Sequence, residues 1–129
     1  MTKRITVPFE ITSWDQTAWS DKDGVQAARA EVAKSFAGEL SGTSAAQVLM
    51  VSVDGQGVAY TAQEVVTGSL EGRSGSFAMA HGAMDGDADA APGRIVPGSG
   101  RGDLAGITGR LEFRHDESGA RLTLEYDLP

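Results

Sequence analysis

Alternation of apolar and polar residues is the strongest pattern in this chain, and it begins near the start. Between Ile5 and Ser13 every second residue is apolar, the period of a β-strand with one buried face. Pro8 lies inside this strand; because proline donates no backbone hydrogen bond, we expect it at an edge, a bulge or a seam. Residues 14–26 are polar and irregular, which predicts a loop whose two tryptophans cover the core or one mouth of a barrel.

The period of two continues through the first half of the chain. It predicts strands at Ala28–Leu40, Ala45–Val53 and Val58–Leu70, separated by turns at residues 41–44 (SGTS) and 54–57 (DGQG). The alanine, glutamate and lysine content of residues 27–37 is also compatible with a short helix. The alternation, together with Gly38, favours a strand there.

The second half of the chain is also divided into short strands by turn residues. Glu71-Gly72 has the form of a two-residue hairpin loop, followed by a strand at Arg73–Ala83. The acidic stretch MDGDADAAPG predicts a loop. A short strand around Arg94–Val96 and a last hairpin of Ile107–Arg114 and Ala120–Asp127 complete the pattern.

Glycine supports closure of this sheet. The chain contains 17 glycines, and many lie between residues 68 and 109, where they permit the bulges and bends that a curled sheet requires. No helical segment is long enough for a parallel crossover. The sequence therefore predicts one all-β domain over residues 1–129, a closed eight-stranded antiparallel meander barrel.

The hairpin at Glu71-Gly72 fixes a register that brings polar side chains together. It places Glu64 opposite Met79 and Ala62 opposite His81, on the more apolar and hence inward face. Glu64 and His81 are then diagonal neighbours within side-chain reach.

Two neighbouring strands add further groups. Pairing Val53 with Val58 places Gln47 opposite Glu64, and Lys34 lies on the same apolar stripe of its own strand. The inward candidates for contact with a ligand are Gln47, Tyr60, Met79, Phe77, Phe36 and Lys34.

The candidate catalytic residues are Glu64 and His81, and the chemistry that they suggest is proton transfer. Burial raises the pKa of a carboxyl group and a neighbouring imidazole lowers it, so such a pair can be tuned towards neutral pH. The alternative is a buried polar pair that only fixes the strand register. His115, beside two charged residues at a turn, is expected to be a solvated loop residue.

Charge and composition exclude several classes of partner. The net charge of −7 argues against nucleic acid and against an anionic membrane surface. The chain has no cysteine, and neither a metal site nor a cofactor motif is expected: the segment PGSGRG lacks the ending of a phosphate-binding loop, and Asp85, Asp87 and Asp89 lack the rest of a calcium loop. With no signal peptide or spanning apolar run, we expect a cytoplasmic protein.

Two segments carry a family resemblance. Residues 64–86 (EVVTGSLEGRSGSFAMAHGAMDG) and 95–113 (IVPGSGRGDLAGITGRLEF) resemble an uncharacterised bacterial family of small proteins, a domain of unknown function assigned to the allene-oxide-cyclase-like barrels. The resemblance extends more loosely over residues 34–44. It implies an eight-stranded antiparallel barrel, and no catalytic residue of the cyclases or of the related dirigent proteins can be carried over to this chain.

Two function classes follow from these observations. In the first, the interior binds a small apolar molecule and promotes its isomerisation or cyclisation by proton transfer from Glu64 and His81. In the second, the core is solid and the chain is a non-catalytic interaction or stress-related protein. We also expect a homo-oligomer, because related barrels assemble and Val48 and Met50 fall on the outward face of their predicted strand.

Overall fold

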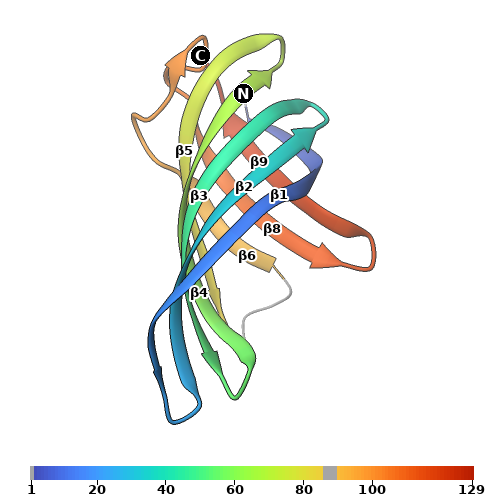
Figure 1. Cartoon of the computed structure of the whole chain (residues 1–129). Coiled ribbons are helices and arrows are strands. Elements are labelled where there is room, and N and C mark those ends of the chain that lie inside the picture. Colours follow the sequence, from blue (N-terminus) through green and yellow to red (C-terminus); the bar gives the residue numbers. More distant parts are fainter. Residues whose placement is uncertain (1, 86–89) are drawn as a thin grey trace.

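The computed structural model describes residues 2–85 and 90–129, which form nine β-strands and no helix (Figure 1). The strands are β1 (Lys3–Lys22), β2 (Val25–Ala37), β3 (Leu40–Val53), β4 (Gln56–Leu70), β5 (Arg73–Met84), β6 (Ala90–Ile95), β7 (Arg101–Gly102), β8 (Thr108–Asp116) and β9 (Gly119–Asp127).

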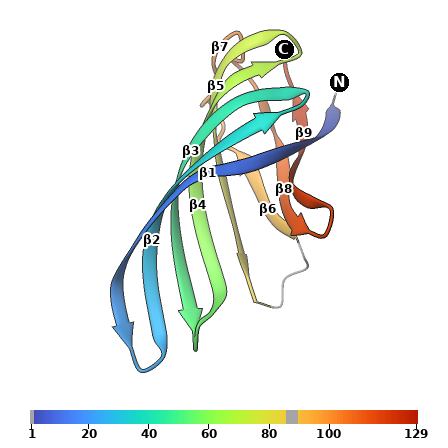
Figure 2. The same ribbon diagram turned by 45° about the vertical axis from the view of Figure 1, so that its right-hand side comes forward.

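Eight of these strands form a ring. The neighbours follow the order β4-β3-β2-β1-β9-β8-β6-β5, and β5 pairs again with β4, so the ring returns to its start. All pairings are antiparallel, and β7 adds a short ninth strand against β5 (Figure 2). The predicted antiparallel arrangement of eight strands in meander order is confirmed to this extent. The finer assignment to the allene-oxide-cyclase-like barrels goes beyond this observation and stays a prediction.

Strand β1 changes partner along its length. Lys3–Pro8 pairs with β9, and Phe9–Lys22 pairs with β2. Pro8 therefore lies at the seam that the sequence suggested. The hairpins β1–β2 and β3–β4 continue past the ring at one end (Figure 2).

The loop predicted for residues 14–26 is wrong. Strand β1 continues to Lys22 and turns at Asp23-Gly24, where φ is 56° and 80°. Positive φ at both central residues is the geometry of a tight hairpin turn with the twist of its strands. The alternation disappears before this turn because β1 is exposed on both faces from Glu10 onwards.

Three other boundaries also differ from the prediction. Residues 41–44 belong to β3, since the chain bends at Gly38-Glu39 instead. The turn in residues 54–57 is only Asp54-Gly55, with φ of 51° and 83°. The predicted acidic loop ends earlier, because β6 starts at Ala90; its residues 86–89 lie outside the described part of the chain. Residues 27–37 are strand, as the alternation indicated.

The interior of the ring has two parts. One part, which we call the packed end, is filled by a cluster of buried side chains: Ile5, Val7, Phe9, Phe36, Leu40, Val66, Leu70, Phe77, Met79, Ile95, Leu104, Ile107, Leu111, Phe113, Leu122, Leu124 and Tyr126. The other part, the open end, has a smaller buried cluster formed by Ala30, Val32, Ala46, Val48 and Ala62. The open end lies towards the projecting hairpins.

No helix that could cross a membrane occurs among residues 2–85 and 90–129. The cytoplasmic location stays a prediction.

Candidate functional site

Glu64 is the residue around which the polar groups of the interior gather. Its side chain is completely buried on β4, where it pairs with Ala46 of β3 and Met79 of β5. The predicted register of the β4–β5 hairpin is confirmed, because Glu64 faces Met79 and Ala62 faces His81 across the Glu71-Gly72 turn.

The Glu64 carboxylate accepts three hydrogen bonds from three different strands. Oε1 accepts from Lys34 Nζ at 3.0 Å and from His81 Nε2 at 2.9 Å, and Oε2 accepts from Ser44 Oγ at 2.5 Å. A carboxylate can be buried when it is paired and hydrogen-bonded in this way. We call Lys34, Ser44, Tyr60, Glu64 and His81 the Glu64 cluster.

Lys34 supplies the positive charge of the cluster. Its ammonium nitrogen lies 4.1 Å from the ring centroid of Phe113 and 4.9 Å from that of Phe9. Aromatic faces attract a desolvated cation, so these two rings replace part of the water that the ammonium group loses. With Glu64 as its anion, the buried pair carries no net charge.

His81 links Glu64 to a phenol. Its Nδ1 lies 2.9 Å from Tyr60 Oη, while Nε2 faces Glu64. An ionised carboxylate only accepts hydrogen bonds, so Nε2 carries a proton and donates it. In the tautomer with its proton on Nε2, His81 accepts a hydrogen bond from the Tyr60 hydroxyl at Nδ1. The three residues form a relay from Tyr60 through His81 to Glu64.

The surroundings shift two pKa values in opposite directions. Burial raises the pKa of Glu64, but the hydrogen bond from His81, the Lys34 charge and the bonds from Ser44 and Lys34 outweigh burial, so the pKa lies below its ordinary value of 4.5. Burial, and secondarily the Glu64 charge, raises the pKa of Tyr60 to about 12. At neutral pH the relay therefore holds a carboxylate at one end and a phenol at the other.

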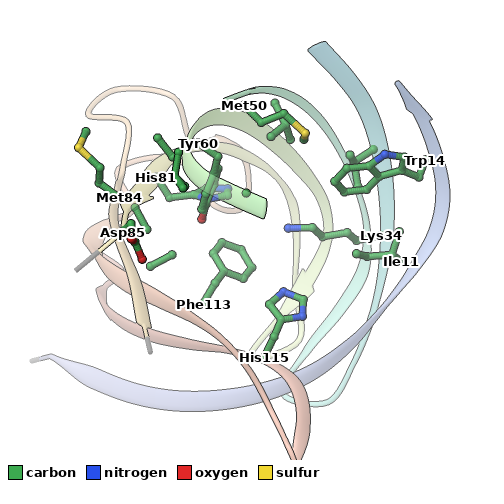
Figure 3. Close-up of a pocket in the computed structure, with 17 residues that line it drawn as sticks. Ile11, Trp14, Lys34, Met50, Tyr60, His81, Met84, Asp85, Phe113 and His115 are labelled. Carbon is green, nitrogen blue, oxygen red and sulfur yellow. The ribbon is translucent and has the colours of Figure 1, made fainter. Parts of the chain in front are cut away.

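A cavity of about 500 Å³ opens beside this cluster at the open end of the ring. Figure 3 shows Lys34, Tyr60, His81, Phe113 and His115 around its space. Its wall also includes Ile11, Trp14, Val32, Val48, Met50, Gly57, Val58, Ala59, Ala83, Met84, Asp85 and Ala91. Glu64 is not part of the wall; it lies behind Lys34 and His81.

The structure separates the predicted ligand-binding residues into two groups. Lys34 and Tyr60 line the cavity. Phe36, Phe77 and Met79 point inward as expected, but they are buried in the packed end and do not line the cavity.

The predicted inward position of Gln47 is wrong, because Gln47 is exposed on the outer face of β3. The β3–β4 turn contains two residues instead of four, and a bulge near Val58 adds one residue to β4, so Ala46 and not Gln47 faces Glu64. A shift of one residue exchanges the two faces of a strand.

The same shift explains other differences in β3. Ser44, which the sequence analysis missed, turns inward and donates to Glu64. Val48 is 8 % exposed and Met50 packs against the smaller cluster, so the predicted outward position of these two residues is wrong as well. The Asp54-Gly55 dipeptide signals the two-residue turn, but that turn alone would pair Gln47 with the inward Ala62. The bulge near Val58 is what turns Gln47 outward.

His115 is not a residue of a loop. It belongs to β8, its ring lies 5.5 Å from that of Phe9, and it lines the cavity. Partial burial, and then the charge of Lys34, lowers the pKa of His115 below 6.5. Its neutral imidazole is therefore a further polar group beside Lys34.

The described residues contain no group of three or more histidine, cysteine, aspartate or glutamate side chains that could hold a metal ion. Two of the three aspartates considered for calcium, Asp87 and Asp89, lie outside those residues.

Comparisons with known proteins agree with the fold. A family model described as "Protein of unknown function (DUF3224)" matches residues 5–128. The structure is similar to the crystal structure of a protein with unknown function from the DUF3224 family of Shewanella oneidensis MR-1, with 26% sequence identity and a TM-score of 0.82 over 100% of this chain and 99% of that chain. No curated protein matches.

Proposed function

This chain belongs to the DUF3224 family of proteins of unknown function, and we propose that it binds a small molecule with an apolar body in the cavity at the open end. The observation that carries the proposal is the cavity itself, about 500 Å³ with a mostly apolar wall and one buried polar cluster at its side. This volume is within the range of small-molecule sites, which combine an apolar wall with few polar groups.

The small residues of the open end support the proposal. Gly57, Ala59, Ala83 and Ala91 line the cavity where larger side chains would fill it. A packed interior without function would be expected to use that space, since empty volume costs stability. The cavity therefore favours ligand binding over the alternative of a solid-core interaction protein.

The polar side of the cavity suits a neutral oxygen atom of the ligand. Lys34 Nζ has three N–H donors, and Glu64 accepts one of them. Because Glu64 already balances the Lys34 charge, a carboxylate that enters would add an uncompensated negative charge in a poorly solvated site. A ketone or ester oxygen can accept from Lys34 without that cost, so we assign the ligand a carbonyl group.

The relay behind the cavity would then support proton transfer. As Tyr60 Oη takes a proton from the carbon next to the carbonyl, its own proton passes to His81 Nδ1, and Glu64 stabilises the imidazolium that forms. Lys34 stabilises the negative charge that develops on the ligand oxygen. Return of the proton to another carbon of the ligand completes an isomerisation.

Ligand binding is tested with a series of methyl ketones of increasing chain length. Trp14 lines the cavity and Trp19 does not, so Trp19→Phe leaves one tryptophan whose fluorescence reports on the site. We expect saturable changes and affinity that increases with chain length. Ala83→Leu, which adds volume to the cavity wall, should weaken binding by about tenfold, whereas Val65→Leu on the outer face should not. An affinity that changes neither with the chain length of the ketone nor with Ala83→Leu would contradict the proposal.

Proton transfer is tested by exchange of the ketone's α-hydrogens for deuterium, followed by NMR. Wild-type protein should accelerate the exchange, and Tyr60→Phe should abolish the acceleration while the ketone still binds. If the ketone binds but its exchange is not accelerated, the protein binds the ligand without catalysing proton transfer, and the catalytic part of the proposal is wrong.

A further inference from the structure

Strand β1 has an edge that its own sheet leaves unpaired. Between Phe9 and Lys22 it forms a ladder with β2 on one side, and among the described residues no strand pairs with its other side (Figure 1). Such an edge presents free backbone N–H and C=O groups and is a template for another strand. Native proteins commonly protect long edges with charges or proline, and here Pro8 precedes the free part.

Large apolar side chains lie along this edge. Ile11 is 43 % exposed, Trp14 49 % and Trp19 60 %. We propose that the edge is the interface of a homodimer, in which the β1 strands of two copies pair antiparallel about a two-fold axis at Gln16. The inference does not depend on the proposed function, and it assigns the surface for the expected self-association that Val48 and Met50 do not provide.

The faces of β1 are compatible with this symmetry. Phe9, Ile11, Trp14, Gln16 and Ala18 are paired with buried positions of β2 and share their inward face. The ladder has one irregularity between Ile11 and Ser13 and one between Ala18 and Ser20. Each arm from Gln16 thus contains one extra residue, so inward residues still oppose inward residues in both arms of the dimer.

This register opposes complementary residues at both ends and next to its centre, while Ile11 faces Asp21. Glu10 of one copy faces Lys22 of the other, and the two-fold axis repeats this pair at the opposite end. Trp14 faces the small Ala18, which leaves room for the indole ring. Ser13 faces Trp19.

Neighbouring registers are worse. Moving the axis from Gln16 to Asp15 would bring two aspartates face to face at the centre, where like charges destabilise a strand pair. Moving it to Thr17 would place Lys22 opposite Thr12 and remove the pair with Glu10. Among these three centres, only Gln16 pairs opposite charges at both ends.

Dimer formation would also affect the cavity. Ile11 and Trp14 line it from the side of the free edge, so a second strand there would extend the wall on that side. The open end would then lie at the dimer interface.

Charge exchange tests the register by sedimentation velocity over about 1 to 200 µM protein, a range that detects micromolar dissociation constants. Glu10→Lys and Lys22→Glu each place like charges opposite one another twice, and each should raise the dimer dissociation constant by about tenfold or more. The double variant Glu10→Lys/Lys22→Glu restores both pairs and should restore the dimer. Glu10→Lys makes the negatively charged chain less negative, so a general charge effect would favour association and cannot explain its loss.

Cross-linking tests the axis independently. The chain has no cysteine, and Gln16→Cys would place two thiols directly opposite each other at a distance that a disulfide can span. Mild oxidation should give a covalent dimer, while Gln47→Cys on the outer face of β3 should remain mostly monomeric. Circular dichroism should show that both variants retain the β-sheet.

Three results would overturn the proposal. The first is a monomer throughout the concentration range, and the second is no more cross-linking through Gln16→Cys than through Gln47→Cys. The third is a dimer that persists in both single charge variants, because it would use another surface. The ketone titrations are evaluated separately, so none of these results bears on ligand binding.

Discussion

The packed end and the open end of the ring are built from the same strands and differ mainly in the size of the residues that point inward. On β2, Phe36 fills the packed end, whereas Ala30 and Val32 face the open end. On β4, the larger Val66 and Leu70 fill the packed end, whereas the small Ala62 faces the open end. The same ring of strands can thus enclose a filled interior at one end and a cavity at the other, because the volume of the inward side chains decides how much space they fill.

Charge distinguishes the two ends as well. The buried polar and charged residues Lys34, Ser44, Glu64 and His81 form one cluster beside the cavity, whereas the packed cluster consists of apolar side chains and Tyr126. Polar groups that border a cavity keep access to a ligand. The packed end thus contributes most of the apolar burial, and the open end holds the buried polar groups on which the proposed function rests.

The largest expected effect comes from removing the central carboxylate. Glu64→Leu leaves Lys34 buried without its anion, and it should lower the free energy of unfolding by about 3–5 kcal/mol. The double variant Glu64→Leu/Lys34→Met replaces the pair by apolar groups and should recover much of the loss. Urea denaturation measures both, with the exposed Glu31→Leu as a control. A loss of less than about 1 kcal/mol would mean that the cluster is solvated.

A matched pair of valines compares the two ends directly. Val66 is completely buried in the packed end, and Val66→Ala should cost about 2–3 kcal/mol from lost burial and a new cavity. Val48→Ala at the open end should cost less than about 1.5 kcal/mol, because Val48 already borders empty space. Equal losses in urea denaturation would show that the open end is as densely packed as the other.

Acid should weaken the protein through Glu64. Its pKa is lower in the folded protein than the ordinary value of 4.5, so the stabilisation is fully present above that value and is lost as the pH falls below it. We expect the free energy of unfolding to decline below about pH 4.5, and to decline less in Glu64→Gln.

An exposed carboxylate provides the control for acid unfolding. A hydrogen bond from Arg121 lowers the pKa of Asp116 to about 2, but this residue is exposed in the β8–β9 hairpin. Salt should therefore remove the difference between wild type and Asp116→Asn, while the difference caused by Glu64→Gln should persist. Equal salt sensitivity would contradict the burial of Glu64.

The smallest effect concerns the imidazole at the cavity. The pKa of His115 should lie below 6.5 in an NMR titration, since burial and then Lys34 lower it. Lys34→Met should raise this pKa, but not to its ordinary value, because burial remains the larger cause. An unchanged pKa would show that His115 and Lys34 do not share the cavity.

The sequence was sufficient to predict the strand register and the inward face wherever a turn signal and the two-residue period agreed. Glu71-Gly72 fixed the β4–β5 register, and this register located Glu64 and His81 on the inward face. The stripe on β2 likewise located Lys34 inside. Asp23-Gly24 and Asp54-Gly55 have nearly the same φ angles as Glu71-Gly72. Turn chemistry could therefore have identified the missed turn at Asp23-Gly24 and the two-residue length of the predicted turn at Asp54-Gly55.

What the sequence by itself determined is the antiparallel strand pattern and the inward face of most strands, because both follow from local periodicity and turn chemistry. Only the tertiary structure decided that Gln47 faces solvent, that Ser44 reaches Glu64 and that a cavity remains beside Lys34. A single bulge near Val58 exchanges the faces of β3, and an interior volume depends on side chains from seven strands at once. Neither the bulge nor the interior volume can be read from any single segment of the sequence.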